Sequence, residues 1–498
     1  MDNSNADTYT PPRKGWRTFL SLWVVQSLSE FGTQITFFAI TIWLAQVLYG
    51  RPEQRGELAL ALAAEGIAFS LTSLLVTPFA GAWADRHDRK RTIVAMDLAS
   101  GAVTLLLMTL VVTHSLQLWQ WIGIVTCLAA FGAFHGSAFN ASHVMLLPPE
   151  QLPRASGMTH MALAFSAIFS PALAATIIAL PTLLRGTTSA GGLGAWVSGL
   201  PDGTALAVGL DGATYLVAAC VVSFLVVPSP SRADLVDASG KMKRSVGEDI
   251  KEGALYIIRR PPLLWLLSLF TIANFLLFPA VLMPLLVKFD LAPDWTAMGL
   301  SYEAALAVIT TTIGVAGLAW GTIITAWGGL KKRRVYAVLL PLLVAGLAQI
   351  GLGLSPSLYF SSAMVFLLVG MGAVMGSHMI AIWQTQTPRE MQGRVSAVRR
   401  VIVQSSAPLG TAIAGWAGGV FDVGMIIAIF GSIVVLYCVI QLFNPQLRRV
   451  EDKSYLDQLA ASRSREGDAA AALLVGRALP IEAPGLATDD QDEARRQN

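Results

Sequence analysis

Long apolar runs recur along this chain, and they restrict its possible folds more than any other feature. A helix of about 20 apolar residues crosses the hydrocarbon core of a bilayer. Twelve runs reach that length, at 18–46, 57–83, 92–113, 117–147, 155–180, 204–227, 263–287, 300–327, 335–354, 357–383, 395–421 and 423–443. Because backbone polar groups in hydrocarbon need internal partners, these runs predict an all-α membrane protein with twelve transmembrane helices.

The positions of Lys and Arg predict the orientation of these helices. If the N-terminus is cytoplasmic, 31 of the 35 basic residues fall in cytoplasmic segments. The other four are Arg51, Arg55, Arg185 and Lys288. Since cytoplasmic loops are enriched in Lys and Arg, we expect a multi-pass cell-membrane protein with both termini inside. Residues 1–17 and 444–498 would then form the cytoplasmic terminal segments, the second of them disordered or a loose helix.

The second half of the chain repeats the first at an offset of 240 residues. Residues 132–156 and 372–396 share nine identities in 25 positions without a gap. The repeat predicts two six-helix bundles, 18–227 and 263–443, which run parallel because six is an even number. The charged linker at 228–262 has helical apolar spacing in its second half, which predicts an amphipathic helix that ends before Pro261. Parallel repeats place a substrate site at their interface.

The segment GAWADRHDRKR, at 81–91, concentrates charge between the second and third runs. A basic cytoplasmic anchor would explain its four cations, but it would explain neither the glycine nor the first carboxylate. We therefore interpret the whole segment as a gate at the inner ends of the helices, made of Gly81, Asp85, Arg86, Asp88, Arg89, Lys90 and Arg91. Gly81 would allow close approach of a neighbouring helix. Asp97 and Glu150 are candidate partners for the cations.

This segment resembles the signature loop of the major facilitator superfamily. SLWVVQSLSEFGTQIT, LDGATYLVAA and EDIKEGALYIIRRPPLL resemble its branch of drug, macrolide and siderophore (enterobactin-type) exporters. The resemblance covers residues 15–445 and implies the major facilitator fold, working as a monomer. It also implies that Asp85 closes the inner side against the N-terminus of the eleventh helix. Asp88 stands where the family usually has glycine, so we expect a left-handed turn position there, which Asp tolerates.

Two paired turns, one in each repeat, are predicted to belong to the same gate. Each contains a proline, an acid two residues later and an arginine four residues after the acid. We expect a local ion pair in each turn, between Glu150 and Arg154 and between Glu390 and Arg394.

Charged and polar residues inside the runs are candidates for proton coupling or for a substrate cavity. Glu30 lies near the middle of the first run, with Gln26 and Gln34 one helical turn away on the same face. Either Glu30 exchanges a proton, or it is a buried acid that holds helices together. Further cavity candidates are His135, Asn140, His378 and Gln404. The histidines lack a nearby carboxylate cluster in the sequence, so we expect no metal site.

The sequence favours a secondary transporter over an enzyme. It contains no phosphate-binding loop, nucleophile elbow or HExxH motif. We expect no cofactor and no nucleic-acid partner, but a small-molecule substrate with protons as the coupling ion. The leading hypothesis is export of a hydrophobic or amphipathic molecule by alternating access, through proton antiport. Uptake, lipid translocation and a transporter-like receptor that uses the tail as its output remain alternatives.

Overall fold

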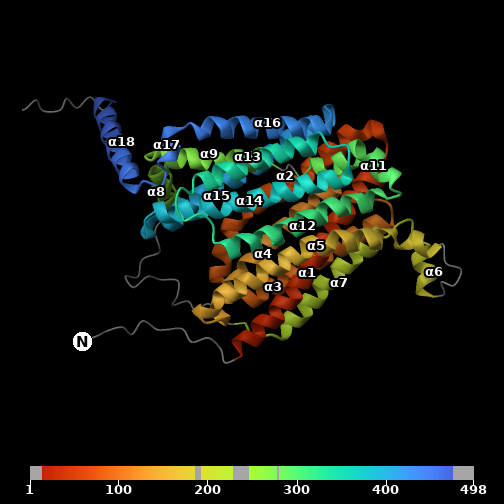
Figure 1. The fold of residues 1–498 in the computed structure, drawn as a ribbon. Coiled ribbons are helices and arrows are strands. Elements are labelled where there is room, and N and C mark those ends of the chain that lie inside the picture. The colour runs from red at the N-terminus through yellow and green to blue at the C-terminus, as the bar shows by residue number, and fades with distance from the viewer. Residues whose placement is uncertain (1–13, 186–191, 228–245, 278–279, 475–498) are drawn as a thin grey trace, which may run out of the picture.

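The structure, a computed structural model, describes residues 14–185, 192–227, 246–277 and 280–474 (Figure 1). The first bundle contains α1 (Gly15–Trp43), its extension η1 (Leu44–Leu48), α2 (Arg55–Arg86), α3 (Arg89–Val112), α4 (Leu118–Leu146), α5 (Leu152–Arg185) and α7 (Thr204–Phe224). The second contains α9 (Pro261–Leu276), α10 (Leu282–Leu285), η5 (Leu286–Asp290), α12 (Tyr302–Trp327), α13 (Tyr336–Gly353), α14 (Leu358–Gln386), α15 (Gln392–Val420) and α16 (Val423–Leu442).

The predicted all-α membrane fold is confirmed. Eleven of the twelve predicted runs each lie mainly on one long helix, and the run 263–287 is divided among α9, α10 and η5. Among the described residues, ten helices are each long and apolar enough to span a membrane. Two further helices of the bundles, α9 and α15, do not meet this criterion of length and hydropathy, each for a local reason. Helix α9 has 16 residues, so it is long enough to span a membrane only when the end of the linker helix is counted with it. Three arginines, at 394, 399 and 400, lower the hydropathy of α15.

Equivalent helix bounds of the two repeats lie 240 residues apart in this part of the structure. Adding 240 to the bounds of α4 gives those of α14. The same offset carries the turn η3 (Pro149–Gln151) onto η6 (Arg389–Met391), and the start of α5 onto the start of α15. The two copies therefore share helix lengths and turn geometry as well as sequence.

The linker helix packs across one end of the second bundle. It is α8 (Val246–Ile258), ends before Pro261 as predicted, and turns by 106° into α9. The Tyr256 hydroxyl donates to the Gln386 carbonyl at 2.7 Å, and Glu252 pairs with Arg394 at 2.7 Å. A side chain at Gly253 would lie 2.6 Å from the Arg394 carbonyl oxygen, so only glycine fits this close contact.

The first part of the tail is docked, whereas the sequence predicted disorder or a loose helix. It forms α17 (Pro445–Arg448) and α18 (Lys453–Leu474). Three apolar side chains of this tail segment are buried, those of Leu447, Val450 and Leu456. Asp457 pairs with Arg260 at 3.0 Å. Hydrogen bonds from the Ser454 hydroxyl, the Tyr455 amide and Arg449 lower the pKa of Asp452, at the start of α18, to about 2.

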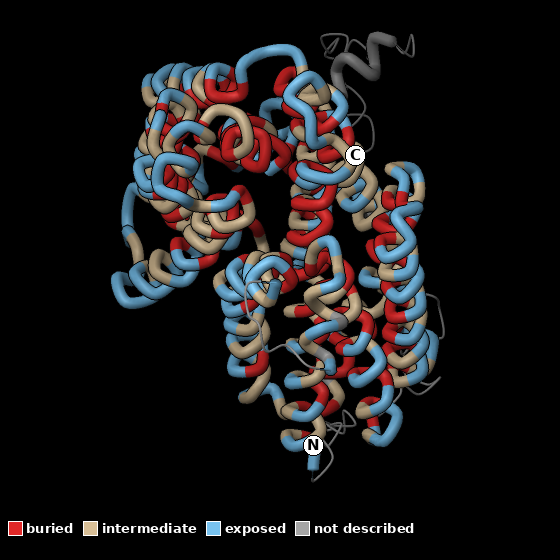
Figure 2. Tube along the Cα trace, turned by 90° about the vertical axis from the view of Figure 1, so that its right-hand side faces the viewer, coloured by how far each residue is buried: buried red, intermediate tan, exposed pale blue. Residues whose placement is uncertain are grey.

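The helices run between two ends of the molecule, which we call the linker face and the loop face. The linker face carries the start of α1 together with α8, α17 and α18 (left in Figure 1). The loop face carries the short helices α6 (Leu193–Ser198) and α11 (Ala292–Ala297). In Figure 2, buried residues gather inside each bundle and exposed residues cover the outside.

The two bundles meet through two helix crossings in the half of the molecule nearest the loop face. Along α2 and α15, Gly56 faces Gly419 and Ala63 faces Gly415. A side chain at Gly415 would lie 2.2 Å from the Ala63 Cβ. Along α5 and α12, a side chain at Gly314 would lie 2.7 Å from the Ile168 backbone nitrogen. Small residues thus let the helix backbones approach closely.

Two cations, Arg55 and Lys288, tie the bundles together beyond these crossings; we call this pair the loop-face latch. Arg55, in the first bundle, donates to the Gly418 carbonyl at 3.1 Å and to the Phe421 carbonyl, at the C-terminal end of α15. Lys288, in the second bundle, donates to the Tyr49 carbonyl at 2.7 Å and to the Ala45 carbonyl, at the end of α1 and η1. Each bundle therefore supplies a cation to a helix C-terminus of the other, where carbonyls lack partners.

The bundles separate toward the linker face. Beyond the Gly66–Thr411 contact, α2 carries exposed side chains, including Phe79 and Trp83. The ribbons of the two bundles diverge in the same direction (Figure 1). The protein is therefore closed at the loop face and open at the linker face.

Candidate functional site

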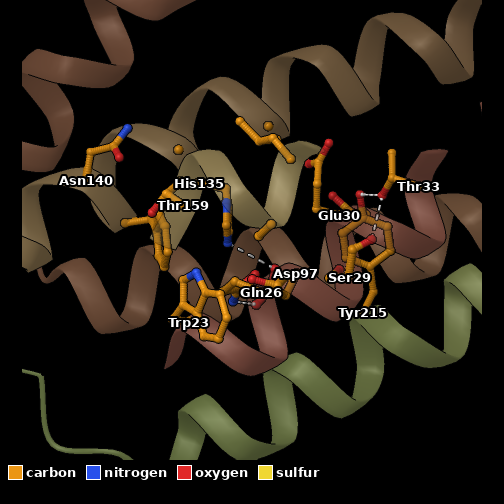
Figure 3. Close-up of a pocket in the computed structure, with 17 residues that line it drawn as sticks. Trp23, Gln26, Ser29, Glu30, Thr33, Asp97, His135, Asn140, Thr159 and Tyr215 are labelled. Atoms are coloured by element: carbon orange, nitrogen blue, oxygen red, sulfur yellow. Dashed lines mark hydrogen bonds and ion pairs between the residues drawn. The ribbon is translucent and has the colours of Figure 1, made fainter. Parts of the chain in front are cut away.

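Three adjoining cavities follow α1 within the first bundle. A polar cavity of about 260 Å³ is lined from α1, α3, α4, α5 and α7 (Figure 3). A second cavity, of about 590 Å³, shares Glu30, Thr33, Gly132 and Tyr215 with it. A third, also of about 590 Å³ and mostly apolar, shares Trp23, Ser27 and Ala162 with the first. The shared lining residues make the three cavities direct neighbours along α1.

Asp97 is the most deeply buried charged group of the polar cavity, with only 1% of its surface exposed. Its Oδ2 accepts a hydrogen bond from Gln26 Nε2 at 2.9 Å. Its Oδ1 lies 3.4 Å from His135 Nε2 (Figure 3). Helices α1, α3 and α4 thus bring together Gln26 and His135, which were predicted as cavity residues, and Asp97, which was predicted as a partner of the loop cations. Asp97 does not contact the cations of 81–91, because it faces into the bundle rather than toward its end.

A second polar cluster connects α1 with α7. The Thr33 hydroxyl lies 2.9 Å from the Tyr215 hydroxyl and 3.2 Å from Asp211 Oδ1. Asp211 is fully buried. Gly32 makes this approach possible, since a side chain there would lie 2.6 Å from Thr214 Oγ1. The sequence placed Asp211 in the scaffold and did not single out Thr33 or Tyr215.

Glu30 lies between the polar cavity and the second cavity and lines both. Its Oε1 accepts a hydrogen bond from Gln34 Nε2 at 2.8 Å, one turn along α1. Glu65, on α2, lines the second cavity, and its buried Oε2 makes no hydrogen bond within the described residues. A carboxylate at a junction of cavities can meet both a proton and a cationic ligand.

The repeat glycines of α4 belong to the cavity wall rather than to a helix contact. Gly132 and Gly136 line the polar cavity, and an added Cβ would meet no atom within 4 Å at either position. Asn140 lies one turn further along the same wall. Gly132 and Gly136 therefore leave room for a ligand.

Two cavity candidates lie elsewhere. His378 is buried under the turn after α12, where its Nε2 accepts a hydrogen bond from the Leu330 amide at 2.8 Å and its Nδ1 lies 2.8 Å from the Val374 carbonyl. The two contacts fix the tautomer and give His378 a structural role in this turn. Gln404 is exposed on α15 and lines none of the three cavities.

The charged segment 81–91 forms the end of α2 and the start of α3. Asp88 has φ −63°, so the expected left-handed turn is wrong. Instead Asp88 caps α3 by accepting from the Arg91 amide at 2.9 Å. Arg89 is buried and donates to the Ala141 carbonyl of α4 at 2.9 Å. No atom would lie within 4 Å of a Cβ at Gly81, so the expected close approach is absent in this open state.

The other residues of the segment lie at the surface. Asp85, Arg86 and Arg91 are exposed, and Lys90 is half-buried. Asp85 makes no hydrogen bond or ion pair within the described residues, which fits the separation of the bundles at this end.

The paired turns form different contacts from those the sequence predicted. No ion pair joins Glu150 to Arg154, both of which the structure describes; the Arg154 guanidinium instead lies 4.7 Å from the Trp16 ring centroid. Glu390 is exposed, while Arg394 reaches the linker helix at Glu252. Each turn arginine therefore binds a segment outside its own turn. Within the described residues, no group of three or more His, Cys, Asp or Glu side chains could hold a metal ion.

Comparisons with known proteins match this architecture. The Major Facilitator Superfamily model matches residues 22–411. Macrolide efflux protein A of Streptococcus pyogenes is 23% identical over 443 residues, which cover 87% of this chain and 98% of the relative. The uncharacterized MFS-type transporter YkuC of Bacillus subtilis is 25% identical over 390 residues, 77% of this chain and 81% of the relative.

Solved structures share the fold at lower identity. One is a bacterial homolog of the human lysosomal transporter Spinster in an inward-facing and unoccupied conformation. It is 16% identical, with a TM-score of 0.60 over 91% of this chain and 96% of that chain. Another is the POT family transporter PepTSo, 13% identical, with a TM-score of 0.57 over 89% of this chain and 99% of that chain. Long apolar helices in two repeated bundles, adjoining cavities in the first of them and a family match over most of the length lead to one conclusion: the chain belongs to the Major Facilitator Superfamily.

Proposed function

We propose that this protein exports an amphipathic small molecule from the cell by alternating access, driven by proton antiport. The observation that carries the proposal is a row of adjoining polar and apolar cavities in a molecule closed at one face and open at the other. Relatives named as macrolide efflux proteins support export as the direction.

The linker face is the cytoplasmic face in this proposal. In the sequence, 31 of the 35 basic residues fall in the segments that would be cytoplasmic in this orientation, as is common in membrane proteins. Both termini and the linker would then lie inside the cell, and the protein would work as a monomer in the cell membrane. The open state would be the one that takes up substrate from the cytoplasmic side.

The cavity walls favour a substrate with a basic amine and a large apolar body. Glu30 and Asp97 line the polar cavity, and none of its described lining residues is Lys or Arg. The adjoining apolar cavity is lined by Val24, Leu28, Phe31, Met161 and Phe165, among others. An acidic subsite beside an apolar one suits a macrolide-like amine better than an anionic siderophore.

Glu30 is the proposed carrier of an exchanged proton, and Glu30→Gln tests it. In inverted vesicles, accumulation of the macrolide erythromycin should fall about tenfold for an imposed gradient of one pH unit, because each coupled proton contributes a factor of about ten per unit. Passive exchange of erythromycin without a gradient should persist, since glutamine preserves the shape of the site. Gradient-driven accumulation that is undiminished in Glu30→Gln would exclude Glu30 as the coupling residue.

Asp85 is the proposed inner gate, with Arg86, Arg89, Lys90 and Arg91 beside it. In the state closed at the linker face, its carboxylate would meet the N-terminus of α15, a contact worth about 1 kcal/mol. Asp85→Asn should therefore shift the ratio of the two states about fivefold toward the open state described above.

The measurement is the distance between spin labels at positions 87 and 393, both exposed at the linker face, with the exposed Cys127 and Cys220 replaced. Asp88→Asn is the matched control, because asparagine caps a helix as well as aspartate does. Equal distance distributions for wild type and Asp85→Asn would remove Asp85 from the gate.

A further inference from the structure

The proposed function places Asp97 in the acidic subsite but gives it no part in proton exchange. Asp97 lines the cavity on α3, deeper than Glu30, and is almost completely enclosed. Among the described residues no Lys or Arg forms an ion pair with it, and its two polar neighbours are an amide and an imidazole. An ionised carboxylate in such a place is costly, because neither neighbour neutralises its charge unless a proton is present.

The geometry around Asp97 has a place for that proton. His135 Nε2 lies 3.4 Å from Asp97 Oδ1, and this nitrogen is buried without a hydrogen-bond partner. Gln26 already occupies Oδ2, so Oδ1 is the free acceptor. A movement of a few tenths of an ångström would bring Oδ1 and Nε2 to hydrogen-bond distance. One proton between them gives a neutral pair, either as carboxylic acid with imidazole or as carboxylate with imidazolium.

We propose that Asp97 and His135 together hold a second exchangeable proton, in addition to the one on Glu30. This inference rests on the proposed proton antiport. The proton enters from the aqueous cavity, converts the Asp97 carboxylate to an acid hydrogen-bonded to neutral His135, and leaves when the cationic substrate occupies the polar cavity. No covalent bond changes other than that to the proton, and the transmembrane gradient supplies it.

The other titratable groups around the pair fit this assignment. Glu30 on α1 and Tyr215 on α7 share the cavity wall, and the Thr33 hydroxyl contacts both Tyr215 and Asp211. None of them contacts Asp97 or His135 through a described hydrogen bond or ion pair. The pair and Glu30 therefore form two separate proton sites, reached from one cavity (Figure 3).

Proton release on substrate binding tests the proposal. Purified protein in weakly buffered detergent solution is titrated with erythromycin, and a pH-sensitive dye reports the protons released. Wild type should release about twice as many protons per bound erythromycin as Asp97→Asn or Glu30→Gln, and the double variant should release almost none. In vesicles with a gradient of one pH unit, accumulation should fall from about 100-fold in wild type to about tenfold in Asp97→Asn.

The controls separate this inference from the proposed function. Asp457→Asn removes a carboxylate on the docked tail and should release as many protons as wild type. If wild type releases no protons, the proposed antiport is overturned, and this inference with it. If wild type and Asp97→Asn release equal numbers, only the second site is overturned. His135→Gln, which keeps the carboxylate, provides an independent variant should Asp97→Asn not fold: reduced release supports the pair, and unchanged release refutes it.

Discussion

Gly415→Leu is expected to prevent closure of the loop face and to abolish transport. At this crossing of α2 and α15 even a Cβ would lie 2.2 Å from the Ala63 Cβ and 3.1 Å from the Ala59 carbonyl oxygen. Neither helix can yield locally, because backbone and Cβ atoms form the contact. Overpacking of this kind costs about 1–3 kcal/mol or more, and here the cost applies only to the state in which the bundles touch. The state open at the linker face should therefore be depopulated roughly tenfold or more.

Spin labels at positions 53 and 297, exposed at the loop face on the two bundles, measure this shift. The label distance should lengthen in Gly415→Leu, and erythromycin transport should drop to the level of empty vesicles. Gly317→Leu is the matched control, since Gly317 is exposed on α12 and a Cβ there meets no atom within 4 Å. Unchanged distances and transport in Gly415→Leu would show that the crossing does not determine closure.

Loss of the loop-face latch is expected to produce the second large effect. In Arg55→Met with Lys288→Met, the C-terminal carbonyls of α1 with η1 and of α15 lose their charged donors from the opposite bundle. A hydrogen bond to a charged group contributes about 1.5–3 kcal/mol, less where water reaches it. Two such losses should shift the conformational ratio at least about tenfold toward opening at the loop face.

The same label pair reports this shift, and each single variant should give an intermediate one. Arg51→Met is the appropriate control, because Arg51 is exposed on the same face and its described contacts stay within the first bundle. A double variant that closes as well as wild type would reduce the latch to an incidental surface contact. The direction is opposite to that expected for Asp85→Asn, so the two experiments check each other.

The sequence predicted the helices well because their apolar length is a strong physical signal. Every span, the repeat and the end of the linker helix at Pro261 follow from apolar runs, ungapped identity and proline chemistry. The candidate site was predicted less completely. The periodicity of the sequence predicts that Asp97 lies within a helix, but not in which direction its side chain faces. The prediction that Asp97 pairs with the loop cations relied on their proximity along the chain, and it is wrong.

Local sequence signals predict two further features of the structure. An acid directly before a helix start predicts an N-cap, and Asp88 before α3 is one. The tail has low overall hydropathy, yet Leu447, Val450 and Leu456 recur at multiples of three, which is enough for one buried face. The contacts of Arg154 with Trp16 and of Arg394 with Glu252 join residues more than 130 positions apart, and a single sequence contains no local pattern that predicts them.

The three adjoining cavities draw every described lining residue from the first 215 positions, while the linker helix and the tail pack on the second bundle. The two copies of the repeat therefore carry different features. Substitutions that change the proposed substrate cavities would fall mostly in the 5′ half of the gene. The latch and crossing residues, by contrast, are encoded in both halves, Arg55 and Ala63 in the first and Lys288 and Gly415 in the second.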